Sequence, residues 1–158
     1  MDQPSQIKLS QLIRSRLIAS LGTLRRGEPM VTMILYAAAD DFSEFYIHTS
    51  RLAMHTQNIL KHPQVNLMIC ESEDKASDPQ MLARISISGT AQALPAIEQD
   101  YEFAKTMYLN KYPSQTFNFQ LGDFSIYRIT PKSARYVAGF GKIFNLTQRD
   151  LVDVSKIK

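Results

Sequence analysis

The sequence predicts a mainly β (α+β) fold, an antiparallel barrel or sandwich with helices inserted between strands. At least five apolar, β-branched segments follow one another with hairpin-length turns, and only two longer helical segments interrupt them. The strict strand–helix alternation of a parallel α/β sheet is absent. Of the 158 residues, 44% are apolar and 21% are charged, which is typical of one globular domain covering residues 1–158.

Alternation of apolar and polar residues locates the strands. Ile85 and Ile87 alternate with Ser86 and Ser88, which predicts a strand with one solvated face. The expected strands, in chain order, are ASLGTL, MVTMILYAA, EFYIHT, QVNLMICE, MLARISISGTAQAL, FSIYRIT and ARYVAGF, with KIFNL as a candidate eighth. The segments RRGEP and DDFS predict turns, and a turn at Pro131 separates FSIYRIT from ARYVAGF.

Helical periodicity is present in a few segments. SQLIRSRLIASL predicts a short helix that ends before Gly22. A second helix is expected from about Ser50 to His62, because Pro63 fits its end. A third is expected in PAIEQDYEFAKTMYLNKY, where Pro95 suits the start, and a short helix closes the chain.

Composition restricts the classes of function. The net charge of +3 comes without the dense basic stripe or aromatic motifs of nucleic-acid binding, so we expect no nucleic-acid partner, whereas a small acidic ligand fits. No apolar run approaches the roughly 18–20 residues of a membrane span, and the N-terminus lacks an apolar signal segment. Cys70 is the only cysteine, so we expect an inert thiol and a cytoplasmic protein.

All three histidines lie in the segment HTSRLAMHTQNILKHP, residues 48–63. On a helix that begins at Ser50, the residues that share one face are Arg51, His55, Asn58 and His62. Ser50 or Thr49 is placed to cap this helix, and the free N–H donors of its first turn would join the arginine and histidine in a phosphate cradle. The alternative is a solvated polar face. A metal site is not expected, because no cysteine or carboxylate lies at ligand spacing.

The order of two long segments carries a family resemblance. The segments are LGTLRRGEPMVTMILYAAADDFSEFYIHTSRLAMHTQNILKHPQVNLMI and FSIYRITPKSARYVAGFGKIFNL. Together they resemble the FMN-binding split-barrel superfamily of pyridoxamine 5'-phosphate oxidases, and most of all its haem-utilisation (HugZ/HutZ-like) branch. The resemblance runs from about Leu17 to Leu151. It implies an antiparallel split β-barrel with two or three inserted helices, and a homodimer that binds flavin at its interface.

The resemblance also implies roles for single residues. The phosphate of FMN would lie at Ser50, Arg51 and His55, while Thr32 and Met33 would contact the rest of the flavin. With His48 and Thr49 at the end of the next strand, Asn58 from the predicted helix face and Lys142 from the sharp bend GFGK, the candidate cofactor-binding residues are Thr32, Met33, His48, Thr49, Ser50, Arg51, His55, Asn58 and Lys142.

Two motifs of the relatives are absent. The oxidases hold pyridoxal with a C-terminal arginine–histidine motif, where this chain has SARYVAGFGKIF. The haem-degrading relatives ligate iron through a histidine after the GFG segment, and this chain has no histidine after His62. We therefore expect neither pyridoxine oxidation nor tight haem ligation of that type.

The leading interpretation is an FMN-dependent oxidoreductase that acts, as a homodimer, on an unidentified small molecule. No catalytic residue can be named, since the isoalloxazine ring carries the electrons. Two alternatives stay open. One is a haem-binding or haem-degradation-related protein on the same barrel, and the other is a cofactor-free binding or regulatory module. In each case we expect no contact with a membrane.

Overall fold

The computed structural model describes residues 1–75 and 78–157, within which eight strands form one antiparallel sheet. The strands are β1 (Ile18–Arg25), β2 (Glu28–Leu35), β3 (Ala37–Ala38), β4 (Phe45–Ser50), β5 (Gln64–Cys70), β6 (Arg84–Leu94), β7 (Phe124–Gly139) and β8 (Lys142–Thr147). Their order in the sheet is β2-β1-β5-β6-β7-β4-β3, with β8 also paired to β7. The predicted mainly β, antiparallel class is confirmed.

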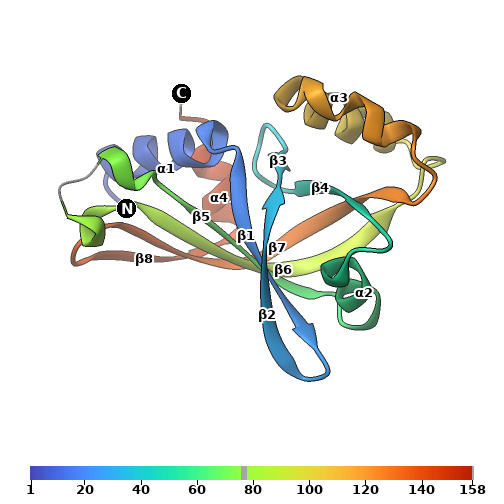
Figure 1. Cartoon of the computed structure of the whole chain (residues 1–158). Coiled ribbons are helices and arrows are strands. Elements are labelled where there is room, and N and C mark those ends of the chain that lie inside the picture. Colours follow the sequence, from blue (N-terminus) through green and yellow to red (C-terminus); the bar gives the residue numbers. More distant parts are fainter. Residues whose placement is uncertain (76–77, 158) are drawn as a thin grey trace.

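The sheet is curled, so that its two edge strands are consecutive in the chain (Figure 1). β2 ends at Leu35 and β3 begins at Ala37, although the sequence predicted one strand across both. The strand breaks at Tyr36, whose N–H leaves the sheet and donates to the hydroxyl of Tyr112 over 3.2 Å. The result is an open half-barrel, in agreement with the split barrel that the resemblance implied.

β7 is a single strand of 16 residues, and the turn predicted at Pro131 is wrong. The register between β6 and β7 shifts between Ser88 and Gly89, opposite Pro131, which is where a strand tolerates a residue without an N–H donor. A Cβ on Gly89 would lie 2.4 Å from the carbonyl oxygen of Thr130, so only glycine fits this close approach. The bulge therefore lets β7 continue from the β4 side of the barrel to β8.

Helices cover the two ends of the curled sheet (Figure 1). They are α1 (Gln3–Ser15), α2 (Met54–Lys61), α3 (Tyr101–Lys111) and α4 (Gln148–Ser155), with 3₁₀ turns η1 (Glu73–Lys75), η2 (Pro79–Met81) and η3 (Pro113–Gln120). α1 lies earlier than predicted, because Asp2 caps it by accepting the N–H of Ser5 over 3.0 Å and Ile18 already begins β1. α3 starts at Tyr101, and Pro95 opens the turn before it.

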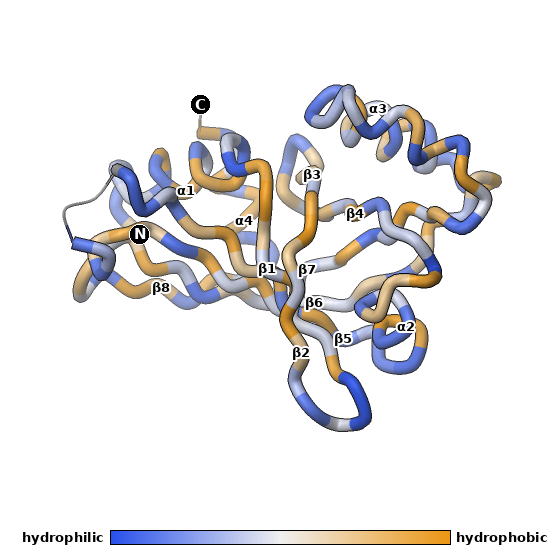
Figure 2. The backbone as a smooth tube through the Cα atoms, in the orientation of Figure 1, coloured by the Kyte–Doolittle hydropathy of each residue, from blue (hydrophilic) through white to orange (hydrophobic). Residues whose placement is uncertain are grey.

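The core lies inside the curl of the sheet and beneath α1 and α4. In β5, Val65, Leu67 and Ile69 are buried, while Asn66 and Met68 point outward, as the alternation predicted. Figure 2 shows the hydrophobic residues concentrated along the strands, with hydrophilic residues in the turns. A smaller cluster packs α3 onto β4 and β7. Among the described residues, no helix is long and apolar enough to cross a bilayer.

Candidate functional site

The chain turns sharply between β4 and α2, and we call residues 48–58, with the groups they contact, the β4–α2 junction. Ser50 is the last residue of β4, where it pairs with Phe124 of β7. Its hydroxyl accepts the N–H of Leu52 over 3.0 Å and donates to the carboxylate of Asp123. α2 begins only at Met54, and its N-cap, Ala53, has no side-chain hydrogen bond. The prediction that Ser50 caps the helix is therefore wrong, because the strand ladder and a tight turn hold it instead.

Arg51 belongs to this turn rather than to α2. Its backbone N–H donates to the carbonyl of Asp123 over 2.7 Å, and its exposed guanidinium donates to the carbonyl of Gly122 over 3.1 Å. The helical face predicted for Arg51, His55, Asn58 and His62 therefore does not form. The guanidinium stands at the surface. The carboxylate of Asp123, which Ser50 binds, belongs to the same turn region and is an unfavourable neighbour for a phosphate.

His55 joins three elements through its ring nitrogens. Nε2 lies 2.6 Å from the hydroxyl of Thr49 in β4, and Nδ1 lies 3.4 Å from the hydroxyl of Thr32 in β2. The Thr49 hydroxyl also lies 3.1 Å from that of Thr56. Burial lowers the pKa of His55, so the ring is neutral at pH 7. This chain of hydrogen bonds links β2 to β4, which are not neighbours in the sheet.

The other two histidines point elsewhere. His48 is buried in an aromatic cluster, stacked on Phe119 at 3.7 Å between ring centroids and beside Tyr108 and Phe124. Burial is the main cause that lowers the pKa of His48 to about 4. His62 is the exposed C-cap of α2. The three rings therefore do not converge, and the described residues contain no cluster of three potential metal-binding side chains.

The remaining predicted residues are dispersed. Asn58 is buried, and its amide donates to the Thr23 hydroxyl over 3.0 Å and to Met30 Sδ over 3.4 Å. Met33 is exposed on the outer face of β2, opposite in direction to Thr32. Lys142 pairs with Asp2 over 3.6 Å, at the far side of the molecule from α2 (Figure 1). The structure thus links Thr32, Thr49 and His55 by hydrogen bonds, with Ser50 and Arg51 in the adjoining turn, whereas the side chains of His48 and Asn58 are directed to other partners and Met33 and Lys142 lie away from the junction.

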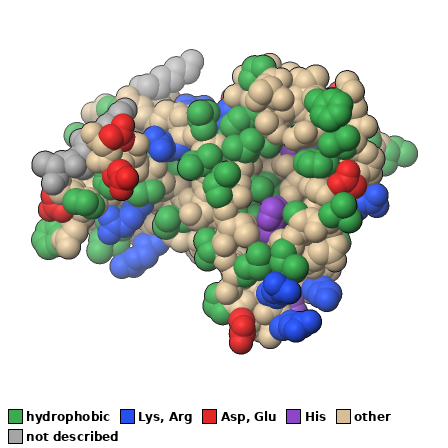
Figure 3. All heavy atoms as spheres, in the orientation of Figure 1, with side chains coloured by type: hydrophobic (Ala, Val, Ile, Leu, Met, Phe, Trp, Pro, Cys, Tyr) green, Lys and Arg blue, Asp and Glu red, His purple; other side chains and the backbone are tan. Residues whose placement is uncertain are grey.

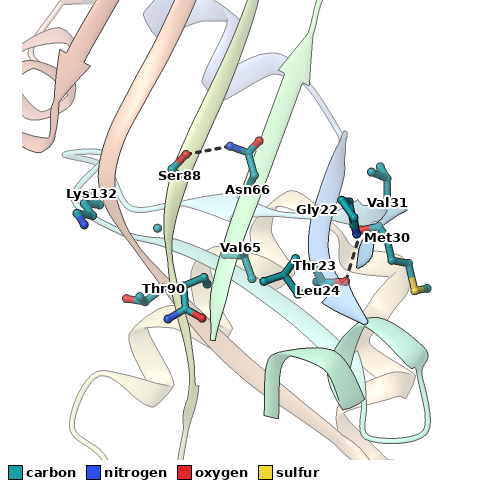
Figure 4. Close-up of a pocket in the computed structure, with 13 residues that line it drawn as sticks. Gly22, Thr23, Leu24, Met30, Val31, Val65, Asn66, Ser88, Thr90 and Lys132 are labelled. Atoms are coloured by element: carbon teal, nitrogen blue, oxygen red, sulfur yellow. Dashed lines mark hydrogen bonds between the residues drawn. The ribbon is translucent and has the colours of Figure 1, made fainter. Parts of the chain in front are cut away.

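A groove that the motifs did not indicate crosses the outer face of β2, β1, β5 and β6 (Figure 4). The strand register aligns Val31, Gly22, Asn66 and Ser88 in one row. Small side chains in this row leave a hollow of about 480 Å³, in which Asn66 donates to the Ser88 hydroxyl over 3.1 Å. The signal in the sequence was the alternation of serines in β6, which marks a solvated face but does not reveal a hollow.

Apolar side chains and one cation border this outer-face groove. Val31 is 67% exposed and Met33 64% exposed, while Met68 follows in the neighbouring row, where Ser20 pairs with both methionines. Lys132, from β7, lines the opposite side, exposed and without a partner among the described residues. The groove combines apolar edges with a free ammonium group, which suits an amphipathic anion.

The curled sheet, with its split between β2 and β4, defines a split β-barrel protein. The family model for pyridoxamine 5'-phosphate oxidase matches residues 6–138, and the chain belongs to this family.

Two heme oxygenases and a heme binding protein are among the proteins that resemble this chain. The chain is 34% identical to the non-canonical heme oxygenase HOZ of Arabidopsis thaliana over 75% of this chain and 34% of that protein. It is 29% identical to the heme oxygenase HutZ of Vibrio cholerae over 69% of this chain and 62% of that protein. A heme binding protein from Mycobacterium smegmatis has the same fold, with a TM-score of 0.86 and 19% identity over 97% of this chain and 62% of that one. The chain spans less than two thirds of each of these proteins, and they support the haem-utilisation branch.

Proposed function

We propose that this protein binds haem in the outer-face groove, at the interface of a homodimer. The observation that carries the proposal is the groove itself, a hollow with apolar edges and a free cation. The similarity to two heme oxygenases supports it. Haem binding thus replaces FMN oxidation as the leading interpretation, and FMN remains the second candidate.

The residues of the groove fit the periphery of haem better than its iron. Leu24 and Val31 offer apolar contacts to the macrocycle, and Lys132 is placed to pair with a propionate. The groove contains no histidine or cysteine among its lining residues. Haem iron would supply redox and oxygen chemistry when bound. The chain's own contribution is to orient the ring and exclude water, so we expect weak binding and an iron that still accepts added imidazole.

A second copy of the chain is the natural cover for the groove. Val31 and Met33 lie on an edge strand, and their exposure leaves an apolar strip along the unpaired side of the sheet. A dimer of the obligate class would bury more than about 2,000 Å². We propose that two outer faces pack together and enclose two grooves.

Titration of the purified protein with haem, followed by the Soret band, tests this function. Gly22→Leu fills the hollow, and the backbone tolerates it because a Cβ there meets Asn66 only at an ordinary 3.5 Å. We expect haem binding to fall at least about tenfold. Gly122→Leu, at an open position beside Arg51, is the matched control and keeps haem affinity. Equal haem affinity in wild type and Gly22→Leu would place haem elsewhere.

FMN is the second candidate because the structure brings five of the predicted residues together at the β4–α2 junction. Thr32, Thr49 and His55 are hydrogen-bonded there, with Ser50 and Arg51 in the adjoining turn. The Asp123 carboxylate and the neutral His55 weaken the site for a phosphate. Titration with FMN under the same conditions decides between the two cofactors, and absence of both spectra supports a cofactor-free module.

A further inference from the structure

A second cavity lies between α1 and α3, beside β3. It has a volume of about 510 Å³ and is bordered by Arg14, Phe42, Phe103, Met107 and Lys111. In the space-filling view, hydrophobic side chains reach the surface between the α1–α4 side and α3 (Figure 3). No lining residue of this α1–α3 cavity also lines the outer-face groove, so the two are separate sites.

Lys111 is the unusual group of the cavity. Its ammonium lies 3.9 Å above the ring of Tyr36 and 5.7 Å from that of Tyr112, at the end of α3. No carboxylate or other acceptor pairs with it among the described residues. Burial lowers its pKa to about 8, which reflects the cost of keeping an unpaired charge in this position. Because Lys111 is partly desolvated and contacts only ring faces, an anion that entered the cavity would stabilise its charge.

The other charged groups that line the cavity are already bonded or exposed. Arg14 donates to the carbonyls of Asp40 and Ser155 over 3.0 and 2.9 Å, and its guanidinium stacks 4.5 Å above Phe42. The Asp40 carboxylate lies at the exposed rim. Burial raises the pKa values of Tyr36 and Tyr112, so their hydroxyls stay neutral. Arg14 adds a fixed positive potential, and Lys111 is the cation that is available to pair with an anionic ligand.

We propose that the α1–α3 cavity binds a small carboxylic acid with an apolar body. Lys111 pairs with the carboxylate, while Phe42, Phe103 and Met107 contact the hydrocarbon. The charge selects an anion over a neutral molecule, and the apolar walls select a hydrocarbon chain or ring over a sugar acid. Binding in this cavity does not depend on which cofactor the barrel takes.

Calorimetric titration with octanoate, and with octanol as its neutral counterpart, tests the proposal. We expect octanoate to bind more tightly than octanol, and Lys111→Met to weaken octanoate about tenfold while leaving octanol unchanged. Lys105→Met is the matched control. Lys105 lies on the same helix and 5.6 Å from the ring of Phe119, but it does not line the cavity, so octanoate affinity stays at the wild-type level.

The pH dependence gives an independent readout. Octanoate binds the protonated amine, so wild-type affinity is full well below pH 8 and falls as the pH rises through about 8 toward 9.5. Lys111→Arg keeps its charge and is expected to bind with a flat profile. Circular dichroism confirms that the variants are folded. Equal binding of octanoate and octanol, or the same loss in Lys105→Met as in Lys111→Met, would overturn the proposal.

Discussion

The β4–α2 junction and the outer-face groove differ in how far their polar groups are already satisfied. At the junction, Ser50 binds Asp123, Arg51 binds Gly122, and both ring nitrogens of His55 face threonine hydroxyls. In the groove, small side chains leave a hollow, and Lys132 has no partner among the described residues. The segment with the most polar and titratable side chains therefore has the fewest groups available for a ligand. The groove carries few reactive groups, but it has the space and the free charge.

The largest expected effect concerns the apolar strip beside the groove. Val31→Asp together with Met33→Asp would place two carboxylates in the proposed dimer interface, where unpaired charge is expensive. We expect light scattering at micromolar concentration to change from dimer to monomer, with a lower melting temperature, because association no longer stabilises the folded subunit. Leu60→Asp, at an equally exposed position on α2, is the control and stays dimeric. A wild-type monomer would contradict the interface.

The second-largest expected effect is the loss of stability at low pH, which arises from a histidine of the junction. The pKa of His48 falls from 6.5 to about 4 on folding, so its contribution to stability is full above pH 6.5 and is lost as the pH falls toward 4. We expect a loss of about 2–3 kcal/mol over that range. His48→Phe keeps the stack on Phe119 and flattens the profile in denaturant unfolding. His62→Ala, at an exposed site, leaves the wild-type profile unchanged.

The same substitution, asparagine to alanine, can be made in each region and compares their contributions to stability. Asn58→Ala removes the buried donor to Thr23 and is expected to cost about 1–3 kcal/mol of unfolding free energy. Asn66→Ala in the groove breaks an exposed bond to Ser88 and a partly buried bond to Ser86, and is expected to cost less than about 0.5 kcal/mol. Urea unfolding measures both. Equal losses would mean that the polar groups of the groove stabilise the fold as much as those of the junction do.

A flavin titration tests whether the β4–α2 junction binds the phosphate of FMN even though its polar groups already have partners. If FMN binds there, Arg51→Ala weakens it about tenfold, because one charge-assisted contact is lost, and riboflavin is unaffected. Asp123→Asn removes the opposing carboxylate and is expected to strengthen FMN about threefold. Fluorescence quenching of the flavin reports both changes. Equal weakening of FMN and riboflavin in Arg51→Ala would assign the arginine to structure instead.

Particular residues show how far sequence reasoning reached. The alternation of Val65, Leu67 and Ile69 predicted β5 and its buried face, and the family resemblance implied the split barrel. Pro131 predicted a turn, yet β7 runs through it, because Gly89 on the neighbouring strand accommodates a bulge. α2 begins four residues later than predicted, since pairing of Ser50 with Phe124 of β7 extends β4 through Ser50.

The sequence by itself determined most of the strands, the antiparallel class and the concentration of polar residues between His48 and His62. The periodicity of apolar residues is a local property, so it predicts a strand or helix without knowledge of the segments that pack against it. Only the tertiary structure decided which of those residues are free. Asp123, Gly122 and Thr32 lie far along the chain from the groups they engage, and a hydrogen bond forms only within about 3 Å. The same holds for the hollow beside Lys132 and the unpaired amine of Lys111, because both arise where distant segments fail to fill a space or neutralise a charge.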